Sequence, residues 1–86
     1  MDMNGKVHNY YESRVFDEIH RKLAELRLSA TEGEFDDIAC IALNKLPPRY
    51  VRFDIDTTFY STPEEIQMMD VAIKNAVELA IVKVIS

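Results

Sequence analysis

The stretch 62-TPEEIQMMDVAIKNAVELAIVKV-84 predicts the longest helix of the chain. Thr62 is a good N-cap, Pro63 suits the first helical position, and Glu65 can close a capping box with Thr62. Apolar residues then recur at helical spacing as far as about Val84. We therefore expect a helix of roughly 22 residues, about 33 Å long.

Two apolar stripes run along this predicted helix. The first contains Ile66, Met69, Ile73, Ala76, Val77, Ala80, Ile81 and Val84. The second contains Met68, Val71, Ala72, Leu79 and Val82, with Asn75 in its middle. Two stripes need two packing partners. An amino-terminal helix can be one of them, and the other is either a second copy of the protein or a short middle helix.

An amphipathic helix is expected near the amino terminus. Asn9 and Glu12 fit a capping box, and apolar residues follow at helical spacing up to about Leu28. These apolar residues are Val15, Phe16, Ile19, Leu23 and Leu26. We expect this helix to be long and to run antiparallel to the carboxyl-terminal one.

A shorter helix is predicted between them, from about Asp36 to Leu46, after the linker 29-SATEGEF-35. Its apolar residues leave hardly any polar side, which is typical of a helix that is buried on all sides. Cys40 would then be a small packing residue of the core.

The double proline that follows should separate this helix from an extended segment. Pro47 and Pro48 end the helix, because proline lacks an amide hydrogen and disfavours helical geometry in the residue before it. The segment 50-YVRFDIDTTFY-60 then alternates apolar and polar residues with the period of a strand. Since the sequence suggests no second strand, we expect either an extended crossing segment or a strand that pairs across a dimer.

Together these segments predict one all-α domain over residues 1–86, with two long antiparallel helices, a short buried helix and an extended connection that contains the prolines. A chain of 86 residues has a small core and usually needs a disulfide, a metal or oligomerisation for stability. Cys40 is the sole cysteine, which excludes an intrachain disulfide and a cysteine-built zinc site. We therefore expect a homodimer.

The charge of the chain restricts its partners. The net charge is −5, and the basic residues are dispersed among acidic ones, so nucleic acid polymers and anionic membranes are poor candidates. The sequence has no run of about 18 apolar residues, and the beginning MDMNGKVHNYYE lacks the apolar stretch of a signal peptide. We expect a cytoplasmic protein, in which a local basic patch can still bind a small anion.

The residues after the double proline have chemistry suited to a ligand. Arg49 and Arg52 offer planar guanidinium groups for phosphate or for the acceptor edge of guanine, and Tyr50 offers a ring for stacking. Pro47 and Pro48 stiffen the backbone ahead of them, so less entropy is lost on binding. The alternative is structural, with Arg49 paired to an acidic side chain and Tyr50 packed in the core.

Three acidic or amide side chains are further candidates. Glu12 falls on the apolar face of the first helix, where it either serves the helix cap or meets Arg49 or a ligand. His8 lies either on the same face or just before the helix. Asp37 and Asn44 are seven residues apart and hence on one face of the middle helix. Both have structural alternatives, Asp37 with the helix dipole and Asn44 with exposed carbonyl groups.

A resemblance to a known family covers nearly the whole chain. The run 37-DIACIALNKLPPRYV-51 closely resembles the signature of the ComFB family of late-competence proteins, and 8-HNYYESRV-15 resembles the amino-terminal pattern of that family. The resemblance implies a small all-helical homodimer without catalytic activity, linked to competence and type IV pilus functions. ComFB-like proteins are also linked to the binding of cyclic di-GMP, a bacterial second messenger.

The positions of this chain that match the family pattern are Glu12, Asp37, Asn44, Pro47, Pro48, Arg49 and Tyr50. From their chemistry and the match we expect them to contact a nucleotide. Some family members bind zinc through a cysteine cluster just before the signature. This chain reads 29-SATEGE-34 in that region, so we predict no metal and no resident cofactor.

The leading hypothesis is a cytoplasmic receptor for cyclic di-GMP that passes the signal to an unidentified protein partner. Arg49 and Arg52 would contact phosphate or guanine, and Asp37 or Glu12 would accept hydrogen bonds from guanine. The alternative is an interaction module of the competence or pilus machinery that binds no nucleotide. An enzyme is not expected, because no nucleophile with a base beside it can be recognised in the sequence.

Overall fold

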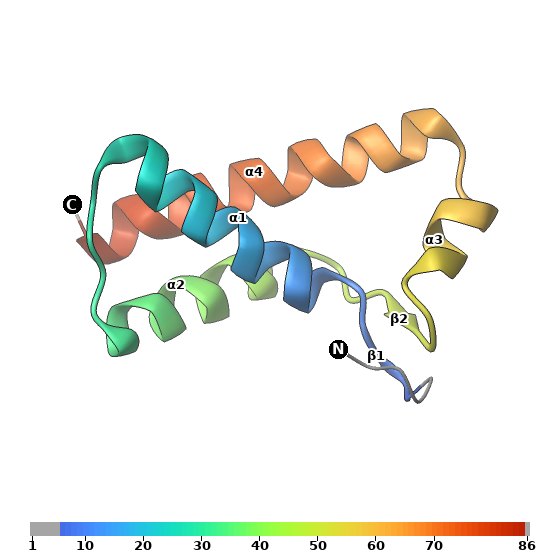
Figure 1. Ribbon diagram of the computed structural model, residues 1–86, viewed down its shortest axis with the longest axis horizontal. Helices are drawn as coiled ribbons and strands as arrows, with labels where there is room; N and C mark the ends of the chain where they lie inside the picture. Colours follow the sequence, from blue (N-terminus) through green and yellow to red (C-terminus); the bar gives the residue numbers. More distant parts are fainter. Residues whose placement is uncertain (1–5, 86) are drawn as a thin grey trace.

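The computed structural model describes residues 6–85, which are mostly helical (Figure 1). In chain order the elements are β1 (His8–Asn9), α1 (Tyr11–Leu26), α2 (Glu32–Lys45), β2 (Tyr50–Val51), α3 (Ile55–Tyr60) and α4 (Pro63–Ile85). The prediction of a mainly helical chain is confirmed. Residues 1–5, part of the stretch from which a cytoplasmic location was expected, lie outside the described residues.

The long helix α4 begins as its sequence predicts. The backbone N–H of Glu65 donates to Thr62 Oγ1 at 3.1 Å, and the backbone N–H of Thr62 donates to Glu65 Oε1 at 2.8 Å. This reciprocal pair is the capping box that satisfies two N–H groups at the helix start. The first apolar stripe is the part of α4 that enters the core, through Ile73, Ala76, Val77, Ala80 and Ile81.

Helices α1 and α4 run in the same direction, so the prediction that they are antiparallel is wrong (Figure 1). The ion pair between them, Lys22 Nζ to Glu78 Oε2 at 3.3 Å, joins the carboxyl-terminal halves of both helices. Their amino-terminal ends also share one hollow, to which Tyr10 and Ile66 both contribute. The physical reason is that the chain reverses its direction twice. Helix α2 runs back along α1, and the chain turns again around α3, so that α4 has the direction of α1.

Helix α2 begins four residues earlier than expected and is buried on one face only. Thr31 caps it, since the N–H of Glu34 donates to Thr31 Oγ1 at 3.1 Å and the N–H of Thr31 donates to Glu34 Oε1 at 2.8 Å. Its buried residues are Ile38, Ala39 and Ala42. Cys40 lies on the exposed side, so the prediction of a buried thiol is wrong. The other helices pack on one side of α2 and leave its opposite side open.

The segment after the prolines is not a single extended stretch. Strand β2 pairs antiparallel with β1, with His8 opposite Val51 and Asn9 opposite Tyr50. The chain then turns at Phe53, whose carbonyl accepts from the N–H of Asp56 at 3.0 Å, and continues as α3. The prediction of an extended segment is therefore wrong for residues 55–60, because the alternation lasts only a few residues and Asp56 in the first turn is favoured by the helix dipole. The two residues that do form a strand pair within the chain, with a second strand that the sequence did not suggest.

The start of α1 differs in detail from the predicted capping box. The residue before α1 is Tyr10, which makes no side-chain cap, while Asn9 Oδ1 accepts from the N–H of Tyr11 at 3.1 Å. Helix α1 ends at Leu26 because Arg27 adopts a left-handed conformation with φ of 57°. The side chains that α1 contributes to the core are Tyr11, Val15, Ile19 and Leu23.

The second stripe of α4 is left largely uncovered by the described chain, since Ala72 alone among its apolar members is partly buried against the core. Met68, Val71, Leu79 and Val82 are all exposed. The alternative that this stripe covers the middle helix is therefore wrong. The chain is also extended, with a radius of gyration of 13.4 Å, whereas a compact domain of this length should have about 12 Å. One chain thus leaves a large apolar helix face in contact with solvent.

A buried hydroxyl in α3 offers a test of this packing. Thr57 is 1% exposed, and its Oγ1 has no hydrogen-bond partner among residues 6–85. Replacing a buried, unsatisfied hydroxyl by a methyl group removes a desolvation penalty. We expect Thr57→Val to raise the free energy of unfolding by about 1 kcal/mol in denaturant titrations. The adjacent and exposed Thr58→Val is the control and should change it little; a loss of stability in Thr57→Val would contradict the buried, unpaired hydroxyl.

Candidate functional site

The backbone after the double proline is fastened to the start of α1. The Tyr10 N–H donates to the carbonyl of Arg49 at 2.6 Å, and the Arg49 N–H donates to Asn9 Oδ1 at 3.1 Å. Asn9 Oδ1 also accepts from the N–H of Tyr11. One side-chain oxygen therefore joins the first helix to the signature segment. Pro47 and Pro48, both exposed, lead into this anchored position.

The side chains that follow the prolines point to solvent. Tyr50 is 67% exposed, so it does not pack in the core of the chain. Arg49 is exposed, and its Nη2 lies 3.4 Å from Ser61 Oγ at the end of α3. Within residues 6–85 it forms no ion pair with Glu12. The structural alternative, in which Arg49 is neutralised and Tyr50 is buried, is therefore not what this chain adopts.

Arg49 acts electrostatically on the first helix. Burial raises the pKa of the Tyr11 phenol above its ordinary value, and the positive charge of Arg49 opposes that rise. This agrees with the backbone hydrogen bond between Tyr10 and Arg49, which places Arg49 beside the start of α1. Arg52 lies three residues further on, with its guanidinium carbon 5.2 Å from the centre of the Phe53 ring. The segment thus presents two cations and one phenol over a short length.

The predicted acidic candidates are less well placed. Asp37 and Asn44 both lie on the open side of α2, as their spacing predicts, and both are exposed. Asp37 is eight residues before Lys45 at the helix end, which is about 12 Å along the helix axis. Asp37 therefore stands well away from Arg49. Glu12 is exposed in the first turn of α1, where a carboxylate is favoured by the helix dipole.

His8 lies in β1, before the helix, and not on its apolar face. Its Nε2 is 2.6 Å from Asp54 Oδ1, and its Nδ1 is 2.8 Å from the carbonyl oxygen of Lys6. The His8–Asp54 contact connects two positions that are 46 residues apart in the sequence. The pair of His8 and Asp54 thus joins the two-stranded sheet of β1 and β2 to the start of α3. The pair therefore helps to fix the position of α3, at whose end Ser61 contacts Arg49.

Sequence reasoning missed the two residues that hold this segment. Asn9 was interpreted only as a helix cap, although it also receives the Arg49 N–H. Ser61, the contact of the Arg49 side chain, carried no recognisable signal, because its position depends on the unexpected helix α3. Within residues 6–85 no group of three or more His, Cys, Asp or Glu side chains could hold a metal ion. None of the described helices is long and apolar enough to cross a membrane.

The family model described as Late competence development protein ComFB matches residues 8–86. The chain belongs to the ComFB family. No curated protein and no solved structure matches it. In this ComFB domain the signature 37-DIACIALNKLPPRYV-51 forms most of α2, the double proline and β2. The family match thus includes both the anchored Arg49 backbone and the exposed Tyr50.

The role of Asn9 in this ComFB domain can be tested by truncation. Asn9→Ala leaves the N–H groups of Tyr11 and Arg49 without their acceptor, so we expect a loss of about 1–2 kcal/mol of unfolding free energy. Hydrogen exchange at the Arg49 amide should accelerate more than at α4 amides. Asn44→Ala is the matched control, because the Asn44 side chain is exposed and forms no hydrogen bond with a described residue. Equal stability of the two variants would show that Asn9 does not hold the segment.

Proposed function

We propose that this ComFB domain is a non-catalytic, cytoplasmic receptor module for cyclic di-GMP that serves competence or type IV pilus functions. Membership of a family described by late competence development supports the link to competence. The observation that best supports a ligand is that Arg49 and Tyr50 are exposed on a backbone that Asn9 and two prolines hold in place. Because this backbone is already held, less entropy is lost when its side chains bind a ligand.

The chemistry of the segment suits a cyclic dinucleotide. Arg49 and Arg52 can form charge-assisted hydrogen bonds with phosphate oxygens, and the Tyr50 ring can stack on a base. The stiff backbone reduces the entropy that binding costs. The net charge of −5 repels a dianion, so these local cations must outweigh it and the affinity should fall as salt is added.

Calorimetric titration with cyclic di-GMP tests the receptor directly. We expect saturable heat with the wild type and, for Arg49→Ala, an affinity lower by roughly ten-fold or more, because a hydrogen-bonded charge is lost. Lys45→Ala, which removes the same charge from an exposed position at the end of α2, is the control. No heat at high-micromolar ligand would refute the receptor, whereas equal affinities of the variants would remove Arg49 from its site.

The receptor is proposed to work as a homodimer that uses the second stripe of α4. Met68 is 71% exposed, and Val71, Leu79 and Val82 are about half exposed along the same face. Exposed apolar surface of this kind marks an interaction site. A chain this small also gains stability from association. A second copy, with an identical stripe, provides the self-complementary surface that a two-fold dimer requires.

Light scattering on a size-exclusion column checks this dimer. The wild type should elute with twice the chain mass of 9.9 kDa. Leu79→Lys places a charge in the apolar stripe of both copies and should shift the mass toward that of one chain. Ala24→Lys adds the same charge to an exposed position of α1 and should leave the mass unchanged. A dimer that survives Leu79→Lys would contradict an interface on this face.

A second candidate is an interaction module that binds no nucleotide. It is favoured by the apolar surface of α3, where Phe59 is 74% and Tyr60 is 83% exposed. These side chains offer large apolar area to a component of the competence or pilus machinery. The titration above separates the two functions, because this candidate predicts no heat with cyclic di-GMP.

A further inference from the structure

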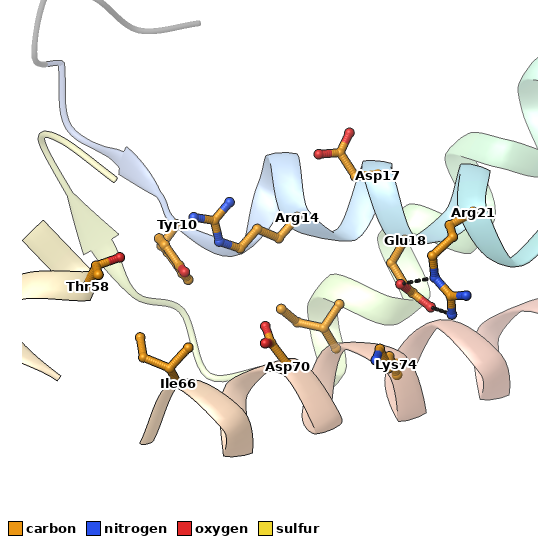
Figure 2. A pocket seen from close by; sticks show the side chains of 10 residues that line it. Tyr10, Arg14, Asp17, Glu18, Arg21, Thr58, Ile66, Asp70 and Lys74 are labelled. Carbon is orange, nitrogen blue, oxygen red and sulfur yellow. Dashed lines mark hydrogen bonds and ion pairs between the residues drawn. The ribbon is translucent and has the colours of Figure 1, made fainter. Parts of the chain in front are cut away.

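Helices α1 and α4 diverge toward their amino-terminal ends (Figure 1). A hollow of about 600 Å³, open to solvent, lies between them (Figure 2). We call it the α1–α4 hollow. Tyr10, Thr58 and Ile66 lie at one end of it, and Arg21 and Lys74 at the other. Its volume lies within the range of small-molecule pockets, about 300–1,000 Å³. None of the residues predicted from the ComFB signature borders it.

A guanidinium is held in position on one wall. The guanidinium carbon of Arg14 lies 4.1 Å from the centre of the Tyr10 ring. Tyr10 is buried, and its ring packs edge-on against Tyr11, so the platform under Arg14 is fixed. Among residues 6–85 the guanidinium N–H groups of Arg14 have no hydrogen-bond acceptor. A stacked guanidinium of this kind keeps its planar donor edge available to a ligand.

A carboxylate faces it from the other wall. Asp70 projects from α4 into the hollow, opposite Arg14 (Figure 2). Within the described chain it accepts no hydrogen bond and forms no ion pair. Ile66 and Ile73 lie one turn before and about one turn after it on the same helix and provide apolar surface. Arg14 and Asp70 thus offer a donor edge and an acceptor edge across one space.

The other charged side chains that border the hollow balance one another. Glu18 accepts from Arg21 Nη2 at 2.6 Å and from Arg21 Nε at 2.9 Å, so these two side chains neutralise each other (Figure 2). Asp17 and Lys74, which also border the hollow, carry opposite charges. The hollow is therefore close to neutral overall and does not select a ligand by net charge. Any preference of the hollow for one ligand would depend on the direction of its free donors and acceptors.

We propose that the α1–α4 hollow receives a guanine base, an inference that rests on the nucleotide-binding function proposed above. Guanine carries N1–H and N2–H donors on one edge, which a carboxylate such as Asp70 accepts together. Its O6 and N7 acceptors form another edge, which the fork of Arg14 can engage. Adenine lacks this separation of donors and acceptors. The base-selecting carboxylate is then Asp70, and not Asp37 or Glu12 as the sequence suggested.

Calorimetry with paired variants tests this site. Arg14→Ala and Asp70→Asn should each weaken cyclic di-GMP binding by roughly ten-fold or more. The direction in which Asp70→Asn changes the affinity is decisive. Removing a negative charge from an acidic protein should strengthen the binding of a dianion unless the carboxylate contacts the base. Lys83→Ala and Asp36→Asn, exposed charges outside the hollow, are the charge-matched controls. Thermal melting confirms that each variant is folded.

A second ligand sharpens the assignment. Cyclic di-IMP lacks the N2 amino group, so it should bind the wild type more weakly than cyclic di-GMP, and Asp70→Asn should shrink that difference. If the wild type binds cyclic di-GMP and Asp70→Asn binds it with equal or higher affinity, the hollow is not the guanine site, although the receptor function still holds. No binding of cyclic di-GMP to the wild type would overturn both proposals. Weakening by the two controls as large as that by the two variants would also refute the hollow.

Discussion

The structure depends on one constraint, which is that a chain of this size can cover only one face of a 23-residue helix. The first stripe of α4 carries the core, because α1 and α2 both pack against Ile73, Val77 and their neighbours. The other face remains open and is the basis of the proposed dimer. Helix α1 runs along α4 in the same direction and is joined to it by the Lys22–Glu78 ion pair in their carboxyl-terminal halves, while their amino-terminal halves border the α1–α4 hollow.

A second, local constraint positions the signature. The double proline ends α2, and the oxygen of Asn9 then receives the N–H groups of both Arg49 and Tyr11. The backbone is thereby fixed at the point where the side chains turn to solvent. Rigid backbone with exposed Arg and Tyr side chains is an arrangement suited to binding, since the cost of ordering has been met in folding.

Much of the fold could be predicted from particular residues. Thr62, Pro63 and Glu65 placed the start of α4, and the helical spacing of its first stripe identified the buried side chains. The start of α2 had the same signal in Thr31 and Glu34, but it was interpreted as a linker. Helix α3 was missed because three alternating pairs of residues fit a strand and a short helix equally well. Burial of Cys40 was wrong because composition does not say which face of a helix meets its neighbours.

The site was harder to predict than the fold. Arg49 and Tyr50 could be recognised because their chemistry and their place after two prolines are local properties, whereas their exposure was left open and is shown by the structure. Arg14 and Asp70 are far apart in sequence and border the same hollow only because α1 and α4 run parallel, which no local pattern shows. The same holds for Ser61, whose contact with Arg49 depends on the corner formed by α3.

Amide chemical-shift mapping by nuclear magnetic resonance tests the central claim most directly. Titration of the labelled protein with cyclic di-GMP should shift the amides of Arg49 and Tyr50 together with those near Arg14 and Asp70, and should leave the Asp37 end of α2 unchanged. An absence of saturable shifts, or shifts confined to α2, would contradict the account.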